Sequence, residues 1–72
     1  MHKYSDLITI STDILGGTPV FKRTRVPVAT LFDYVETGKT VSDFIDDFPS
    51  VEKEQAIEIL QLFKNKILNL VA

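Results

Sequence analysis

Residues 16–28 decide the architecture of this chain and read Gly-Gly-Thr-Pro-Val-Phe-Lys-Arg-Thr-Arg-Val-Pro-Val. The opening glycine pair tolerates positive φ, so the chain can turn sharply there. Val20, Phe21 and Val26 are strand formers that flank four polar residues, a pattern typical of a short hairpin. Pro27 fixes φ and withholds a donor where a helix could begin. We therefore predict that this segment ends an extended region and starts a helical one.

A second extended segment is predicted upstream of the glycine pair. In residues 7–11 two isoleucines alternate with polar residues, and a period of two is typical of a half-buried strand. We expect this strand to pair with the arms of the hairpin, so that residues 7–27 form a short β segment. Residues 1–6 are mostly polar and are expected to be loose.

Two short helices are predicted next, because apolar residues recur at helical spacing from Val28 onward. Gly38 can supply the left-handed residue that commonly ends a helix. Thr40 is predicted to cap the second helix together with Asp43, in a variant of the capping box. Pro49 then ends that helix. The two apolar stripes comprise Val28, Leu31, Phe32 and Val35, followed by Val41, Phe44, Ile45 and Phe48.

The third predicted helix is the longest and has Ser50 as its N-cap. It runs from about residue 51 to residue 70 and carries more apolar residues than one small neighbour can cover. One set falls at coiled-coil spacing: Ala56, Leu60, Phe63, Ile67 and Leu70. We predict that one face joins the core and the other meets a partner or a second subunit. The residues predicted for that interface are Ile57, Leu62, Ile67, Leu68 and Val71.

Size and composition limit the possibilities further. The 72 residues make one predicted domain over residues 1–72, with a β segment at 7–27 and a three-helix segment at 28–72. A chain this short is marginally stable alone, which favours a homodimer. The net charge of −2 is not that of a general nucleic-acid binder, and without cysteine no disulfide or thiolate metal site can form. No apolar run is long enough for a membrane span and no signal peptide is evident, so we expect a cytoplasmic protein.

Catalytic chemistry finds little support in the sequence. The single histidine, His2, is expected to be solvated in a loose terminus. Asp46 and Asp47 are adjacent on a predicted helix and point about 100° apart, so their carboxylates do not converge. We predict a solvated acidic face, with no catalytic residue, metal or cofactor. The alternative hypothesis is a small hydrolase that uses these aspartates.

The order of second helix, short break and third helix is that of a helix-turn-helix. In such a motif the start of the last helix faces base edges, whereas Glu52 and Glu54 would repel phosphates. The alternative is a plain helical hairpin. The hairpin tip carries the densest basic cluster, which suits phosphate or carboxylate, although its charges could equally be solubilising or Arg25 could pair with Asp33. The predicted DNA-binding residues are Lys22, Arg23, Arg25, Ser50, Lys53 and Gln55.

Together these motifs resemble the family named domain of unknown function 433. The resemblance rests on the glycine, proline and Thr-Arg pattern of residues 16–28, on Gly-Lys-Thr at 38–40 and on Phe-Pro-Ser at 48–50, and it extends from Ile8 to about Ile67. The family usually has glycine where this chain has Arg23. This departure bears on the hairpin turn, because positive φ is unfavourable for a residue with a Cβ.

The resemblance implies a small helix-turn-helix protein without enzymatic activity. Many members of that family are described as antitoxins that accompany a PIN-like ribonuclease toxin. The implied partners are such a nuclease, bound through apolar surface and the Arg23/Arg25 hairpin, and operator DNA. The alternative is a dimerisation or protein-interaction module that binds neither toxin nor DNA.

Overall fold

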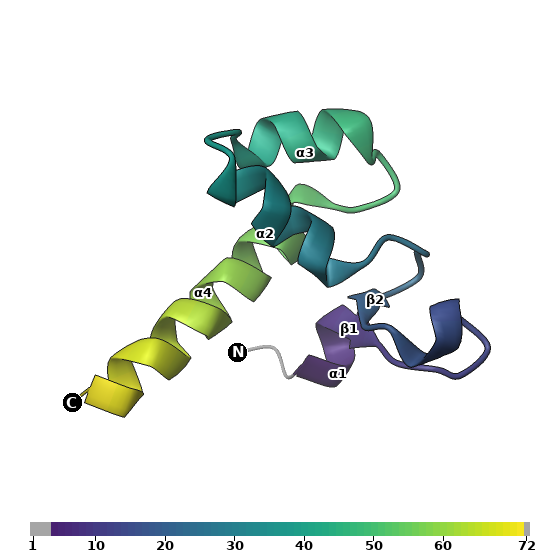
Figure 1. The fold of residues 1–72 in the computed structure, drawn as a ribbon, viewed down its shortest axis with the longest axis horizontal. Coiled ribbons are helices and arrows are strands. Elements are labelled where there is room, and N and C mark those ends of the chain that lie inside the picture. The colour runs from purple at the N-terminus through teal and green to yellow at the C-terminus, as the bar shows by residue number, and fades with distance from the viewer. Residues whose placement is uncertain (1–3, 72) are drawn as a thin grey trace.

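The structure, a computed structural model, describes residues 4–71 and places a small sheet before the three helices α2, α3 and α4 (Figure 1). The elements in order are α1 (Tyr4–Leu7), β1 (Ile8–Thr9), the 3-10 turn η1 (Leu15–Gly17), β2 (Val20–Phe21), α2 (Val28–Glu36), α3 (Val41–Asp47) and α4 (Lys53–Val71). The predicted α+β class, with a short β segment followed by three helices, is confirmed. His2 lies outside the described residues.

The sheet consists of β1 and β2, paired antiparallel with Ile8 opposite Phe21 and Thr9 opposite Val20. The strand predicted over residues 7–11 is shorter than expected. Continuing the register places Ile10 opposite Pro19, which has no backbone donor, so the ladder ends there and Ile10 is 67% exposed.

Before the sheet, the chain is helical where a loose terminus was expected. The helical turn α1 ends at Leu7, which is buried against the core and packs α1 onto α4. After β1, the predicted sharp turn is present at the glycine pair, where Gly16 and Gly17 have φ of 66° and 95°. Leu15 shares this conformation with φ of 48°. The turn returns the chain to β2.

Helix α2 starts and ends close to where the sequence predicts. Pro27 is the residue before the helix rather than its first turn, and the backbone N–H of Val28 donates to the carbonyl of Pro19 (3.0 Å). At the other end Gly38 has φ of 85°, and its N–H donates to the carbonyl of Val35 (3.1 Å). Lys39 N–H donates to Tyr34 in the same motif (3.0 Å). These two bonds form a Schellman motif, so the predicted glycine stop is confirmed.

The capping box predicted for α3 is present in full. The N–H of Asp43 donates to Oγ1 of Thr40 (3.1 Å), and the N–H of Thr40 donates to Oδ2 of Asp43 (2.9 Å). The backbone hydrogen bond from Thr40, helped by its hydroxyl, lowers the pKa of the Asp43 carboxyl below its ordinary value of 3.8. The box therefore stabilises the charged carboxylate at neutral pH.

Helix α4 begins at Lys53, so the prediction of Ser50 as its N-cap is wrong. The N–H of Val51 donates to the carbonyl of Phe48 (3.0 Å), which closes a turn and buries the Val51 side chain. The helix can start only after this turn. Gln55 then takes the role of the N3 residue of a capping box, because its Oε1 accepts from the N–H of Glu52 (3.0 Å).

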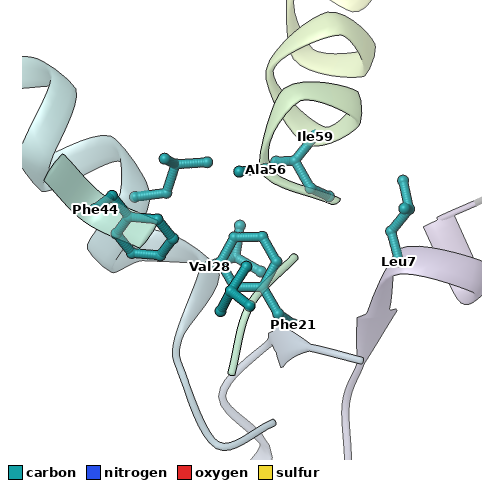
Figure 2. Packing of buried hydrophobic residues seen from close by; sticks show 8 residues of the cluster. Leu7, Phe21, Val28, Phe44, Ala56 and Ile59 are labelled. Carbon is teal, nitrogen blue, oxygen red and sulfur yellow. The ribbon is translucent and has the colours of Figure 1, made fainter. Parts of the chain in front are cut away.

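Eight buried apolar side chains form one cluster between the sheet and the start of α4 (Figure 2). Phe21 from β2 and Phe44 from α3 lie in it with ring centroids 5.7 Å apart. Tyr34 and Phe48 extend the aromatic contacts from Phe44, at 5.4 and 5.2 Å. The cluster comprises Leu7, Phe21, Val28, Leu31, Phe44, Val51, Ala56 and Ile59. Every helix from α1 to α4 and strand β2 thus contributes to one core.

The capping box makes the free energy of unfolding decrease at acid pH. Because the pKa of Asp43 is lower in the folded chain than in the unfolded one, the box contributes fully above pH 3.8 and is lost as pH falls through the folded pKa. We expect the melting temperature to fall over this range, and Asp43→Asn to remove that part of the fall. Thermal unfolding followed by circular dichroism between pH 6 and pH 2.5 measures both.

Asp46→Asn is the matched control, since Asp46 lies on the same helix outside the box and should keep the wild-type pH profile. Superimposable profiles for the wild type and Asp43→Asn would contradict the assignment.

Candidate functional site

The basic turn, residues 22–25, is held rigidly by its own backbone. The N–H of Thr24 donates to the carbonyl of Phe21 (3.0 Å), which closes a β-turn, and the N–H of Phe21 donates to Val26 (2.9 Å). The Thr24 side chain is buried, with Oγ1 donating to the carbonyl of Phe21 (2.8 Å) and accepting from the N–H of Val26 (3.0 Å). The predicted hairpin tip is therefore a fixed platform for its basic side chains.

Arg23 occupies the third position of this β-turn with φ of 65°. That position favours glycine in turns that need positive φ, because a Cβ there is strained by about 1–2 kcal/mol. The structure thus places an arginine in the conformation for which glycine is the usual residue. Strain of this kind commonly accompanies functional sites, and the Arg23 side chain at this position is exposed.

Arg23 and Arg25 lie on a shared shallow hollow of about 600 Å³. The hollow is lined by Thr9, Ile14, Arg23, Thr24, Arg25 and Ser50. Ser50 comes from the turn between α3 and α4, so the fold brings the basic turn and the α3–α4 turn to one surface. Two guanidinium groups and a hydroxyl around one hollow can hold a phosphate or carboxylate group by charge-assisted hydrogen bonds.

Acidic residues share a second, smaller hollow of about 150 Å³ with Arg23. They come from α1, from the residue before α4 and from the first half of α4. The acidic residues of this hollow are Asp6, Glu52, Glu54 and Glu58. Because these charges repel phosphate, the start of α4 is less suited to a DNA groove than the Arg25 and Ser50 side of the turn.

Gln55 does not have the role predicted for it. Its side chain is only 8% exposed, and Nε2 donates to the carbonyl of Lys22 (3.4 Å) while Oε1 accepts from Glu52. Gln55 is therefore a support that ties the basic turn to the start of α4, and it cannot read a base edge in this conformation. Lys53 and Ser50 are exposed, and Lys22 is half-buried.

The distal half of α4, residues 63–70, forms a second candidate surface. It extends away from the other elements (Figure 1) and leaves large apolar side chains exposed. The exposed fractions are 52% for Phe63, 45% for Ile67, 52% for Leu68 and 77% for Leu70. Of the interface residues predicted from sequence, Ile67 and Leu68 lie here. Ile57 is 38% exposed nearer the core, Leu62 is half-buried, and the Val71 side chain lies outside the described part.

Two of the three carboxylates on the acidic face of α3 have structural hydrogen bonds. Asp43, Asp46 and Asp47 share a hollow of about 290 Å³ with Lys39. Asp43 serves the capping box, and Asp47 accepts a hydrogen bond from the Tyr34 hydroxyl (2.6 Å), which raises the pKa of Tyr34 above 10.0. Within residues 4–71 no group of three or more His, Cys, Asp or Glu side chains is placed to hold a metal ion.

No helix in the described part of the chain combines the length and the apolar character that crossing a bilayer requires.

Comparisons with known proteins agree with the motifs. The model of the family described as "Protein of unknown function (DUF433)" matches residues 8–62. An uncharacterized protein, y4eO, of Sinorhizobium fredii (strain NBRC 101917 / NGR234) is 42% identical over 50 residues, which is 69% of this chain and 23% of that protein. The chain thus spans about a quarter of the length of this relative. No solved structure matches the chain significantly.

The positive φ of Arg23 predicts that Arg23→Gly stabilises the chain. Relief of about 1 kcal/mol of strain exceeds the free-energy cost of the added backbone entropy of glycine in the unfolded chain. The free energy of unfolding therefore rises by ~0.5 kcal/mol. For a domain of this size that gain raises the melting temperature by about 2–4 °C. Arg23→Ala removes the side chain but keeps the strain, so it serves as the control and should not gain. A melting temperature for Arg23→Gly at or below that of Arg23→Ala would contradict the strain.

Proposed function

The chain belongs to the DUF433 family of proteins of unknown function, and from that premise we propose that it is an antitoxin-like protein without enzymatic activity. Its proposed partner is a PIN-like ribonuclease in the cytoplasm. The observation that carries the proposal is the exposed apolar stripe on the distal half of α4, which comprises Phe63, Ile67 and Leu70. An apolar side chain left in water forgoes roughly 1.5–3 kcal/mol of burial, and an exposed apolar patch of this kind typically marks an interaction site.

The position of the stripe supports a binding role rather than a structural one. The core closes around the first half of α4, where Ala56 and Ile59 are buried. Beyond Phe63, the distal half lies outside that core and has no neighbour among the described elements in Figure 1. The part of α4 beyond Phe63 therefore does not contribute to the core of this chain, and its apolar side chains are available to a partner.

Operator DNA is the second proposed partner, favoured by the hollow that Arg23, Arg25 and Ser50 share. This surface joins the basic turn to the turn between α3 and α4, which leads into the helix that would enter the groove in a helix-turn-helix. A homodimer is proposed with it, because helix-turn-helix proteins usually read two half-sites. The acidic start of α4 opposes deep entry into the groove, so phosphate contacts from the basic turn would dominate the affinity.

The alternative function is a small dimerisation or protein-interaction module that binds no DNA. It uses the same exposed stripe and leaves Arg23 and Arg25 as solubilising charges. The two functions differ in salt-dependent DNA binding and in whether a nuclease is neutralised.

We expect this chain to neutralise a PIN-like nuclease encoded beside it when the two are co-expressed. Ile67→Ser/Leu70→Ser should weaken the complex at least about tenfold, because these side chains are exposed in the free chain and are proposed to be buried on binding. Growth rescue and isothermal titration measure the effect. Ile10→Ser is the matched control, since Ile10 is 67% exposed on a different surface. Unchanged toxicity with the wild-type protein would remove the antitoxin function.

Binding to upstream DNA should weaken steeply as salt rises, since phosphate contacts release counterions. Arg23→Ala/Arg25→Ala should lower the logarithmic salt slope by about 2, or roughly one per lost contact. Gel shifts with the upstream DNA over 50–300 mM salt measure the slope. Lys39→Ala is the control, because Lys39 lies over the Tyr34 ring (4.9 Å) away from the basic turn. Absence of a shift at the lowest salt would leave the interaction module as the function.

A further inference from the structure

We infer that the distal half of α4 docks into an apolar groove rimmed by carboxylates on a partner protein. The inference rests on the proposed function and specifies the chemistry of its partner. Two features carry it: the shape of the apolar stripe and the sign of the charges beside it.

Three of the exposed side chains form a continuous line along the helix. Phe63, Ile67 and Leu70 are spaced four and three residues apart, which places them within about 60° of one another around the helix. The Phe63 ring also contacts the Phe32 ring of α2, with centroids 5.2 Å apart, so the stripe starts at a point fixed to the core. From there it continues outward along α4 to Leu70. A groove that accepts one helix edge fits this shape.

A lysine flanks this line of side chains on each side, and the exposed Leu68 lies beyond Lys64. At 100° per residue, Lys64 lies about 100° from Phe63 in one direction, and Lys66 lies about 60° from it in the other. No acidic residue occurs between Ile59 and Val71. The chain as a whole carries a net charge of −2, so this uniformly basic border is a local property. Carboxylates on the rim of the partner groove would face these ammonium groups.

A second copy of the chain is a poor occupant. Two such helices side by side would bring lysines on one copy near lysines on the other, and like charges oppose pairing. A groove surrounds a helix on more than one side, so it buries more of the stripe than a second helix can.

An anionic membrane surface is also disfavoured. Recognition of anionic lipid by a basic segment usually takes a cluster of four to eight lysines or arginines, and the distal half of α4 has two.

The test uses the full chain and two synthetic amphipathic peptides of about 18 residues with the same leucine stripe. One peptide has glutamates on both borders of the stripe and the other has lysines. By fluorescence anisotropy at 50 mM salt, the glutamate peptide should bind at least about tenfold more tightly, and this preference should shrink at 500 mM salt. Lys64→Glu/Lys66→Glu should reverse the preference. Lys39→Glu is the control and should keep it, and Ile67→Ser/Leu70→Ser should lose both peptides.

Several results would overturn the inference. These are equal binding of the peptides, preference for the lysine peptide, and failure to bind either one. A wild-type dimer in analytical ultracentrifugation that dissociates in Ile67→Ser/Leu70→Ser would assign the stripe to a second copy. Tighter binding to vesicles of anionic phospholipid than to the glutamate peptide would assign it to a membrane.

The nuclease assay separates this inference from the proposed function. A charge preference measured with the peptides, together with a nuclease that the chain does not bind, leaves the inference standing and removes the antitoxin. A neutralised nuclease whose binding is unchanged by Lys64→Glu/Lys66→Glu retains the antitoxin and overturns the inference.

Discussion

The contact between the Phe21 and Phe44 rings is the constraint on which the rest of the structure depends. It joins a sheet of only two short strands to the helices, with centroids 5.7 Å apart and both side chains fully buried. A hairpin of this size is barely stable in water alone. Its register and its turn persist because Phe21 is held by α3 and α4, so the geometry of the basic turn follows from the core.

The basic turn shows how the core shapes a candidate site at a distance. The Phe21 carbonyl accepts from both the N–H and the hydroxyl of Thr24, and the Lys22 carbonyl accepts from the buried side chain of Gln55. The tip is thus held by hydrogen bonds to Phe21 of strand β2 and to Gln55 of α4. These bonds hold the turn in the conformation that gives Arg23 its positive φ, and the contacts around the turn offset the strain.

The two candidate surfaces have different physical character. At the basic turn, arginines compete with the carboxylates at the start of α4, so its electrostatics are mixed and its ligand must approach from the Arg25 and Ser50 side. The distal half of α4 is apolar with a border of one sign only. Both surfaces depend on α4: Gln55 in its first turn supports the basic turn, and its second half carries the exposed apolar side chains beyond the core.

Local patterns in the sequence determined the class of fold, the Schellman stop at Gly38, the capping box of Thr40 and the surplus apolar residues of α4, because each depends on neighbours a few residues away. Tertiary structure alone decided the positions that depend on distant contacts. Burial of Val51 delays α4 to Lys53, and Pro19 opposite Ile10 shortens the strand. Gln55 becomes a buried support because a carbonyl 33 residues earlier in the chain lies within reach of its amide. A sequence pattern carries no record of such a neighbour, since only the closing of the core brings it near.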